Sequence, residues 1–187
     1  MFTIKDTDLI ILSKLDDRDL LSTCLVNKDA NRLCRDENFW RNRFISRYGE
    51  KDFEFMRNKV VSWRKFMLLL IKYLDLGEND WNKAMINAAK DGKMALIDFF
   101  ILKGAKGWNW GMYGAAAGGH RELVDFFISK GADNWNRGMN GAAKGGHREL
   151  VDFFISKGAD YWDLGMYFAR KGGHKDLVKF FESKLKK

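Results

Sequence analysis

Apolar residues recur along the second half of the chain with a step of 27 residues. Within one step the small and apolar positions follow the spacing i, i+3, i+4 and i+7, as in Trp135, Gly138, Met139 and Ala142. This spacing predicts a short amphipathic helix. The residues that follow, 147–157, carry a broader apolar stripe, which predicts a second helix packed on more than one side. The pattern therefore predicts a unit of two helices that is repeated in series.

Tryptophan, glycine and histidine mark the period most clearly. The residues that keep the 27-residue step are Trp81, Trp108, Trp135, Trp162, Gly92, Gly119, Gly146, Gly173, His120, His147 and His174. A fixed period of this length is typical of a solenoid, in which each unit buries a face only against its neighbours. The chain has no proline, so we expect its helices to end at glycines and polar caps. The predicted fold is all-α.

The pattern divides the chain into three segments. We expect one domain at residues 1–50, linking helices at 51–80, and four repeats at 81–107, 108–134, 135–161 and 162–187. Phe66–Leu76 resembles the second helix of a repeat and is expected to act as a half-repeat on which the first full repeat stacks. Polar residues at apolar positions are expected in a terminal repeat. In the fourth repeat these residues are Arg170, Lys179 and Glu182.

Comparison of the four repeats separates a constant face of the first helix from a variable one. The variable positions are spaced i, i+3, i+4 and i+7, so they share one side of the helix. Aromatic residues rimmed by lysine and arginine have the composition of a binding hot spot, whereas neutral drift at solvent positions is the alternative. The predicted target-binding residues on this stripe are Lys83, Ile86, Lys90, Trp110, Tyr113, Arg137, Asn140, Lys144, Leu164, Tyr167, Phe168 and Lys171.

Charge and composition narrow the class of partner. The chain has a net charge of +8, and residues 81–187 hold 18 basic and 11 acidic side chains. This surplus favours acidic partners, either protein or nucleic acid. No apolar run reaches the ~18 residues of a membrane span, and the N-terminus lacks the pattern of a signal peptide. Cys24 and Cys34 are expected to be unpaired, which favours a reducing, cytoplasmic or nuclear location.

The repeated histidines do not predict a metal site. Successive helices lie roughly 8–10 Å apart, whereas a zinc ion holds its nitrogen ligands about 2 Å from itself. We expect His120, His147 and His174 to tie the glycine turns to neighbouring repeats instead. No nucleophile–base set or phosphate-binding loop is present in the sequence, so we expect neither an enzyme nor a cofactor.

The first 45 residues carry a different pattern, which predicts three short amphipathic helices. Asp16 or Asp17 is expected to cap the second helix, and Asp36 a last helix that carries Phe39, Trp40 and Phe44. A segment of this length has a marginal core of its own. We therefore expect it to need the repeats or a partner, and a cap that merely shields the solenoid is the alternative.

Two stretches of the sequence resemble known families. Ala142–Val151 and Gly158–Asp160 are similar to the ankyrin repeat, although that repeat runs about 33 residues and begins with a β-hairpin. Here the unit is shorter, so the hairpin is expected to be missing or reduced to a tight turn. Residues 4–44 resemble the F-box, with departures at Thr3-Ile4 and Asn27–Ala30. An F-box, a Ser62-Trp63-Arg64 helix and short ankyrin-like repeats together resemble proteins of giant DNA viruses of amoebae.

The resemblance implies a substrate-recognition adaptor without chemistry of its own. The F-box would bind a Skp-type adaptor of a cullin ubiquitin ligase, and the repeats would hold a target protein. The adaptor-docking set, some of which must be internal core, is Ile4, Ile11, Leu12, Leu15, Leu20, Leu21 and Val26. A scaffold without a ubiquitin link is one alternative. The other is a basic solenoid that binds nucleic acid through Lys90, Arg137, Lys144 and Lys171, with binding that weakens steeply with salt.

Overall fold

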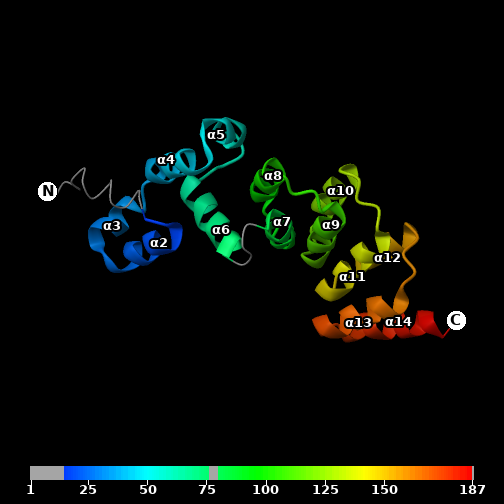
Figure 1. The fold of residues 1–187 in the computed structure, drawn as a ribbon. Coiled ribbons are helices and arrows are strands. Elements are labelled where there is room, and N and C mark those ends of the chain that lie inside the picture. The colour runs from blue at the N-terminus through cyan, green and yellow to red at the C-terminus, as the bar shows by residue number, and fades with distance from the viewer. Residues whose placement is uncertain (1–14, 76–79, 187) are drawn as a thin grey trace. The chain divides into compact units, whose positions relative to one another are not determined.

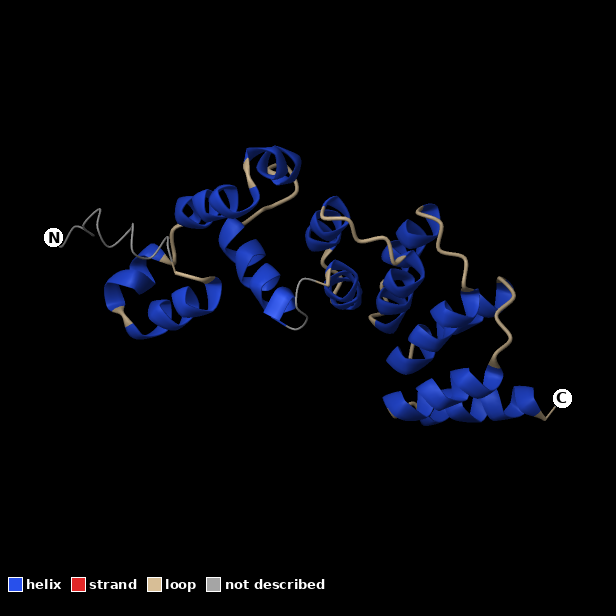
Figure 2. Cartoon of the chain, in the orientation of Figure 1, coloured by secondary structure: helices blue, strands red, loops and turns tan. Residues whose placement is uncertain are grey.

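The computed structural model describes residues 15–75 and 80–186, and these residues form helices, turns and loops with no strand (Figure 2). The predicted all-α class is confirmed. The chain divides into two compact units, Met1–Leu76 and Gly77–Lys187. The helices described in the first unit are α2 (Asp17–Val26), α3 (Lys28–Leu33), α4 (Glu37–Tyr48), α5 (Glu50–Met56) and α6 (Trp63–Asp75). Residue boundaries at 50 and 80, and stacking of Phe66–Leu76 on the first repeat, stay predictions.

Polar side chains begin the helices of the first unit. Asp16 Oδ1 accepts a hydrogen bond from the backbone N–H of Asp19 at 2.8 Å, so Asp16 is the cap of α2. The side chain of Asn27 caps α3, and Asp36 caps α4 as the sequence predicts. Such caps satisfy backbone donors that the first turn of a helix leaves unpaired.

Asp17 links α2 to α4 instead of capping a helix. Its carboxylate is nearly buried and accepts a hydrogen bond from Arg43 Nε at 2.8 Å, and it also pairs with Arg47. Arg43 donates a further bond to the carbonyl oxygen of Leu15 at 2.6 Å. Because a buried charge is costly without a partner, this ion pair fixes how the two helices meet.

Aromatic rings fill the space between α4 and α6. The ring of Phe44 lies 4.9 Å from that of Trp63 and 5.9 Å from that of Phe66, and Phe44 is fully buried. Trp40 is also buried, and its indole N–H donates to the carbonyl oxygen of Cys34 at 2.8 Å. Aromatic burial of this kind supplies a core for a unit whose first 45 residues alone would be marginal.

The expectation that the two cysteines are unpaired is wrong, because a disulfide joins Cys24 to Cys34. Their Cα atoms lie 6.1 Å apart, because α3 folds back on α2 after the turn at Asn27. Asn31 strengthens this turn by donating to the carbonyl oxygen of Cys24 at 2.9 Å. The two cysteines therefore no longer support a reducing location for the protein.

The second unit is a series of helix pairs, which Figure 1 shows following one another from α7 and α8 to α13 and α14. The first helices of the pairs contact one another in order, and each also packs on the second helix of its own pair. Their bounds are α7 (Trp81–Lys90), α8 (Met94–Leu102), α9 (Trp108–Ala117), α10 (Arg121–Ser129), α11 (Trp135–Gly145), α12 (Arg148–Ser156), α13 (Trp162–Gly172) and α14 (Lys175–Leu185).

Glycine allows the two helices of a pair to touch. A β-carbon on Gly138 of α11 would overlap the ring of Phe154 on α12, and Phe154 is fully buried. The same relation joins Gly111 to Phe127 and Gly165 to Phe181. The small residue of the constant face therefore makes room for the large residue of the next helix, as close packing requires.

Glycines also end both helices of a repeat, as the sequence predicts. Gly146 ends α11 with φ of 80°. Gly158 has φ of 104° and follows α12, and the next residue, Ala159, donates its N–H to the carbonyl oxygen of Phe154 at 3.0 Å. A left-handed glycine with this bond is the usual C-terminal motif of an α-helix.

Histidine side chains tie neighbouring repeats together, in agreement with the structural role expected for them. His120 Nε2 lies 3.0 Å from the carbonyl oxygen of Lys90, and His174 Nε2 lies 3.1 Å from that of Lys144. A carbonyl oxygen can only accept, so Nε2 carries the hydrogen. Each bond reaches back to the end of the preceding repeat's first helix, where carbonyl groups have no partner inside the helix.

Asparagines make a second link between repeats, which the sequence analysis did not predict. Asn109 Oδ1 accepts from the backbone N–H groups of Asp133 and Asn134, both at 2.9 Å. The equivalent oxygen of Asn82 accepts from Lys106 and Gly107, and that of Asn136 from Asp160 and Tyr161. Each asparagine thus holds the loop that leads into the next repeat. The shared 27-residue step was a signal that could have revealed this ladder.

Candidate protein-interaction surfaces

An aromatic cluster spans three repeats on the variable side of the first helices. On α9, the rings of Trp110 and Tyr113 lie 5.8 Å apart. On α13, those of Tyr167 and Phe168 lie 5.3 Å apart. The ring of Tyr113 also lies 6.0 Å from that of Phe168, although α11 stands between their helices. These four residues, predicted separately from the sequence, are therefore brought together, and we call them the aromatic cluster.

The bridge between α9 and α13 depends on a missing side chain. Gly141 of α11 packs so closely on α9 that a β-carbon would overlap the carbonyl oxygen of Tyr113. Gly114 has the same relation to the carbonyl oxygen of Ile86 on α7. Gly114 and Gly141 occupy the i+4 position of the variable stripe, so this position faces the preceding helix in repeats 2 and 3. It is buried there, so it contributes spacing rather than contact with a partner.

Cationic side chains lie on the aromatic rings. The guanidinium carbon of Arg137 is 3.9 Å from the ring centroid of Trp110. Lys144 Nζ lies 5.9 Å from the centroid of Tyr113, and Lys171 Nζ lies 5.9 Å from that of Tyr167. Cations within about 6 Å of a ring centroid are attracted to its face. Arg137, Lys144 and Lys171, three of the predicted basic residues, thus border the aromatic cluster.

Exposure within the cluster is uneven. Trp110 is 47% exposed and Tyr167 is 53% exposed, whereas Tyr113 and Phe168 are half-buried. Desolvation by burial raises the pKa of the Tyr113 phenol above 10.0, although the charge of Lys171 lowers it in part. The phenol is therefore protonated at neutral pH. Leu164, also predicted from the sequence, adds a 42% exposed apolar side chain on α13.

Asn140 is the predicted site residue whose position differs most from expectation. Only 6% of this residue is exposed, and its Oδ1 has no hydrogen-bond partner within the described part of the chain. Asn140 lies on α11, the helix that contacts both α9 and α13, and it directly precedes Gly141. It is therefore not part of the exposed surface that the aromatic residues offer.

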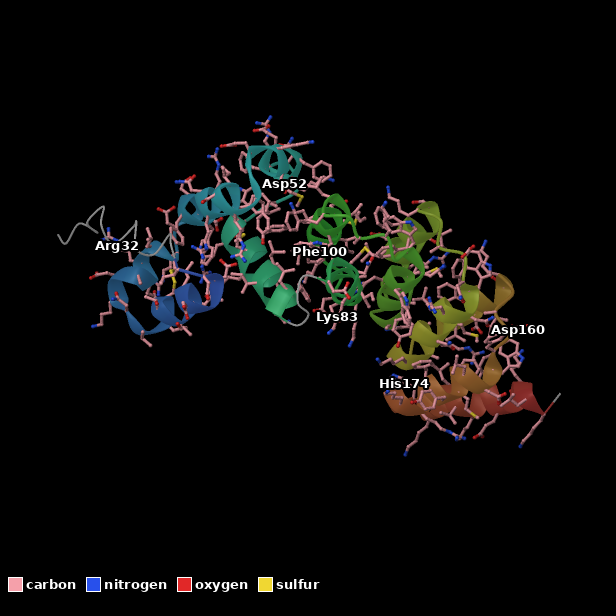
Figure 3. All side chains as sticks on the ribbon, in the orientation of Figure 1. Arg32, Asp52, Lys83, Phe100, Asp160 and His174 are labelled. Carbon is pink, nitrogen blue, oxygen red and sulfur yellow. A yellow bond between two sulfur atoms is a disulfide. The ribbon has the colours of Figure 1, made fainter. Side chains whose placement is uncertain are left out.

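The predicted residues of the first repeat stand outside this cluster. Lys83, which Figure 3 labels, and Lys90 are exposed on α7, whereas Ile86 is half-buried beside Gly114. Their helix carries no aromatic residue on the variable side. The stripe is thus basic in the first and third repeats and aromatic in the second and fourth.

A second exposed apolar surface lies in the first unit, where α2 turns into α3. Leu25 is 83% exposed and Val26 is 86% exposed, and both line a hollow of about 320 Å³ together with polar residues of α3. Leu21 lines a neighbouring hollow of about 350 Å³ that also borders Leu25. Adjacent apolar side chains with this exposure are typical of a surface that meets a partner.

The other predicted docking residues are distributed differently. Leu20 is fully buried, so it is an internal member of the set, and Leu15 is half-buried. Ile4, Ile11 and Leu12 lie outside the described residues. Leu25 was missed because its apolar character resembles that of the core positions beside it in the sequence.

Two kinds of site are absent from the described residues. No three histidine, cysteine, aspartate or glutamate side chains in residues 15–75 and 80–186 gather closely enough to hold a metal ion. Every helix within these same ranges is also too short or too polar to cross a bilayer.

Comparison with known proteins finds one matching family, and the match lies in the first unit, Met1–Leu76. No curated protein matches the chain. The family model described as F-box-like matches residues 9–46, which include α2, α3 and the first ten residues of α4. This stretch includes the exposed residues Leu25 and Val26. The first unit of the chain therefore contains an F-box-like domain, a module for protein interaction.

Proposed function

We propose that the protein is a substrate-recognition subunit of a Skp–cullin–F-box ubiquitin ligase. The F-box-like match at residues 9–46 carries this proposal, because such domains typically bind Skp-type adaptors. The exposed pair Leu25 and Val26 supports it, since these side chains offer apolar surface that an adaptor would cover. An intracellular location follows from this role.

The second unit would hold the target protein in this proposal. Its helix pairs resemble ankyrin repeats that have lost the β-hairpin, and the whole arrangement resembles F-box proteins of giant DNA viruses. The aromatic cluster and the basic residues around it supply the target-binding surface. Catalysis would then arise from proximity alone, because holding the target near the ligase raises its effective concentration there.

Co-purification with a Skp-type adaptor tests the docking step. We expect the wild-type chain to retain the co-expressed adaptor, and Val26→Asp to lose most of it, because a charge would be buried against an apolar partner. Val61→Asp is the matched control. Val61 is also fully exposed in the first unit but lies outside the F-box-like match.

Circular dichroism of each variant separates lost docking from lost folding. Both substitutions affect exposed side chains, so we expect unfolding midpoints close to that of the wild type. A wild-type chain that does not retain the adaptor would contradict the proposal. Equal retention by Val26→Asp and Val61→Asp would show that the exposed pair is not the docking surface.

A further inference from the structure

Charge is divided between the two rows of helices in the second unit. The first helices of the repeats, α7, α9, α11 and α13, carry six basic residues and one acidic residue. The second helices, α8, α10, α12 and α14, carry five basic and seven acidic residues. Among the helices, the excess of basic residues therefore lies on the row that carries the aromatic cluster, which favours an acidic partner there.

Two of these cations are held at the cluster by its own rings. Arg137 stacks at 3.9 Å on Trp110, and Lys144 lies between α9 and α13 near Tyr113. A carboxylate that approaches the rings would meet these charges at once, and a guanidinium can bind it through two parallel hydrogen bonds. Lys171 adds a third charge on α13 beside Tyr167.

Asn140 adds a requirement for a hydrogen-bond donor. Its Oδ1 is buried without a partner, which costs free energy in the unbound protein. An amide oxygen accepts bonds from N–H or O–H groups, so a partner satisfies it with a donor. A main-chain N–H of an extended peptide is one such donor.

Nucleic acid fits this surface less well. Sequence-independent binding of single strands relies on aromatic faces that are open for stacking by bases. Here the guanidinium of Arg137 already covers Trp110, and the ring of Phe168 contacts those of Tyr113 and Tyr167 edge to face. Carboxylates need only the charged rim, whereas bases would have to displace it.

We infer that the aromatic cluster binds an extended acidic segment of a target protein, with carboxylates at Arg137, Lys144 and Lys171 and a main-chain N–H donated to Asn140. This rests on the proposed function, since the segment would belong to the protein that the ligase modifies. The binding itself needs no adaptor, however. It can therefore be tested, and can fail, independently of F-box docking.

Selection from a library of random peptides displayed on phage tests the inference with the full-length protein as bait. We expect the enriched peptides to be rich in aspartate and glutamate, and their affinity, measured by fluorescence anisotropy, to fall with rising salt. Trp110→Ala should weaken binding by about 30-fold or more, as truncation of an aromatic hot spot does. Tyr161→Ala is the matched control, because Tyr161 is 61% exposed but takes no part in the cluster.

Asn140→Leu distinguishes binding from packing. Leucine is close in size and leaves no orphaned acceptor, so the variant should be as stable as the wild type or more stable. Its affinity for a selected peptide should nevertheless fall about tenfold, because the buried acceptor is gone. Unchanged affinity of Asn140→Leu would show that the peptide does not donate a hydrogen bond to Asn140.

Other outcomes overturn the inference as a whole. These are no enrichment from the library, enriched peptides without an acidic bias, or equal losses in Trp110→Ala and Tyr161→Ala. Tighter binding of a labelled oligothymidylate than of any selected peptide would also overturn it and assign the surface to nucleic acid. None of these results depends on whether the adaptor binds.

Discussion

Replacing Asn109 by alanine should loosen the joint between the second and third repeats. The asparagine accepts two backbone bonds of 2.9 Å from Asp133 and Asn134 and donates a third of 3.2 Å to the Asp133 carboxylate. These groups are exposed, so water replaces the lost partners and each short bond contributes only about 1 kcal/mol. The change therefore removes about 2 kcal/mol of stabilisation before other effects are counted.

Helix propensity opposes part of this loss. Asn109 lies in the first turn of α9, and alanine is more favourable than asparagine within a helix by about 0.5 kcal/mol. The net destabilisation should therefore be about 1.5 kcal/mol. The stability of Asn109→Asp should lie between those of the wild type and Asn109→Ala, because aspartate keeps an acceptor but places a second carboxylate beside Asp133.

The fourth repeat supplies a matched control at the same position. Asp163 stands where the other repeats have asparagine, and it has no loop of a following repeat to bind within the described residues. Alanine at position 163 gains a similar helix propensity. It also loses a negative charge near a helix N-terminus, which contributes about 0.3–1 kcal/mol, so the two effects nearly cancel. Asp163→Ala should therefore change stability by less than about 0.5 kcal/mol.

Urea unfolding followed by tryptophan fluorescence measures these differences. Five of the seven tryptophans lie in residues 81–162, so the signal reports mainly on the repeats. A value for Asn109→Ala within about 0.5 kcal/mol of the wild type would refute the reasoning. Equal destabilisation by Asn109→Ala and Asp163→Ala would refute it as well, because the loss would then not come from the link between repeats.

Three further predictions concern other contacts. Gly145→Ala should destabilise the repeats by about 2 kcal/mol in urea unfolding, because its β-carbon would overlap the carbonyl oxygen of Ala117, whereas unchanged stability would show that the helices part freely. Arg43→Met should lower the stability of the first unit by about 2 kcal/mol, because Asp17 would lose its buried partner and keep only the more exposed Arg47, and adding Asp17→Asn should restore part of the loss. Burial raises the pKa of Tyr113 above 10.0, so above that pH the folded state binds more protons than the unfolded state and stability falls as pH rises. Tyr113→Phe should fall less steeply over the same range, and identical slopes would contradict this cause.

The periodic part of the fold could be predicted from the sequence because its contacts repeat. Each helix pair, its glycine turns and its histidine use the same sequence positions four or three times, so the pattern reveals them. Contacts that occur once leave no such signal. The pairing of Asp17 with Arg43 and the disulfide between Cys24 and Cys34 join residues whose separation says nothing about their contact.

The candidate site was predicted in composition but not in geometry. Comparison of the repeats selected the aromatic and basic residues of the first helices, and the structure brings Trp110, Tyr113, Tyr167 and Phe168 together. The burial of Asn140 could not be predicted, because the equivalent residues of the other repeats, Ile86, Tyr113 and Tyr167, are half-buried or exposed.

The bridge from Tyr113 to Phe168 makes the proposed target-binding surface span more than one structural repeat. Every link of the scaffold joins neighbours, so excision of one whole step, residues 108–134, would leave equivalent partners facing each other. The ring pair joins residues two repeats apart and would vanish with that excision. Loss or gain of a single repeat would thus preserve the solenoid but change the ring pair on which the proposed target-binding surface depends.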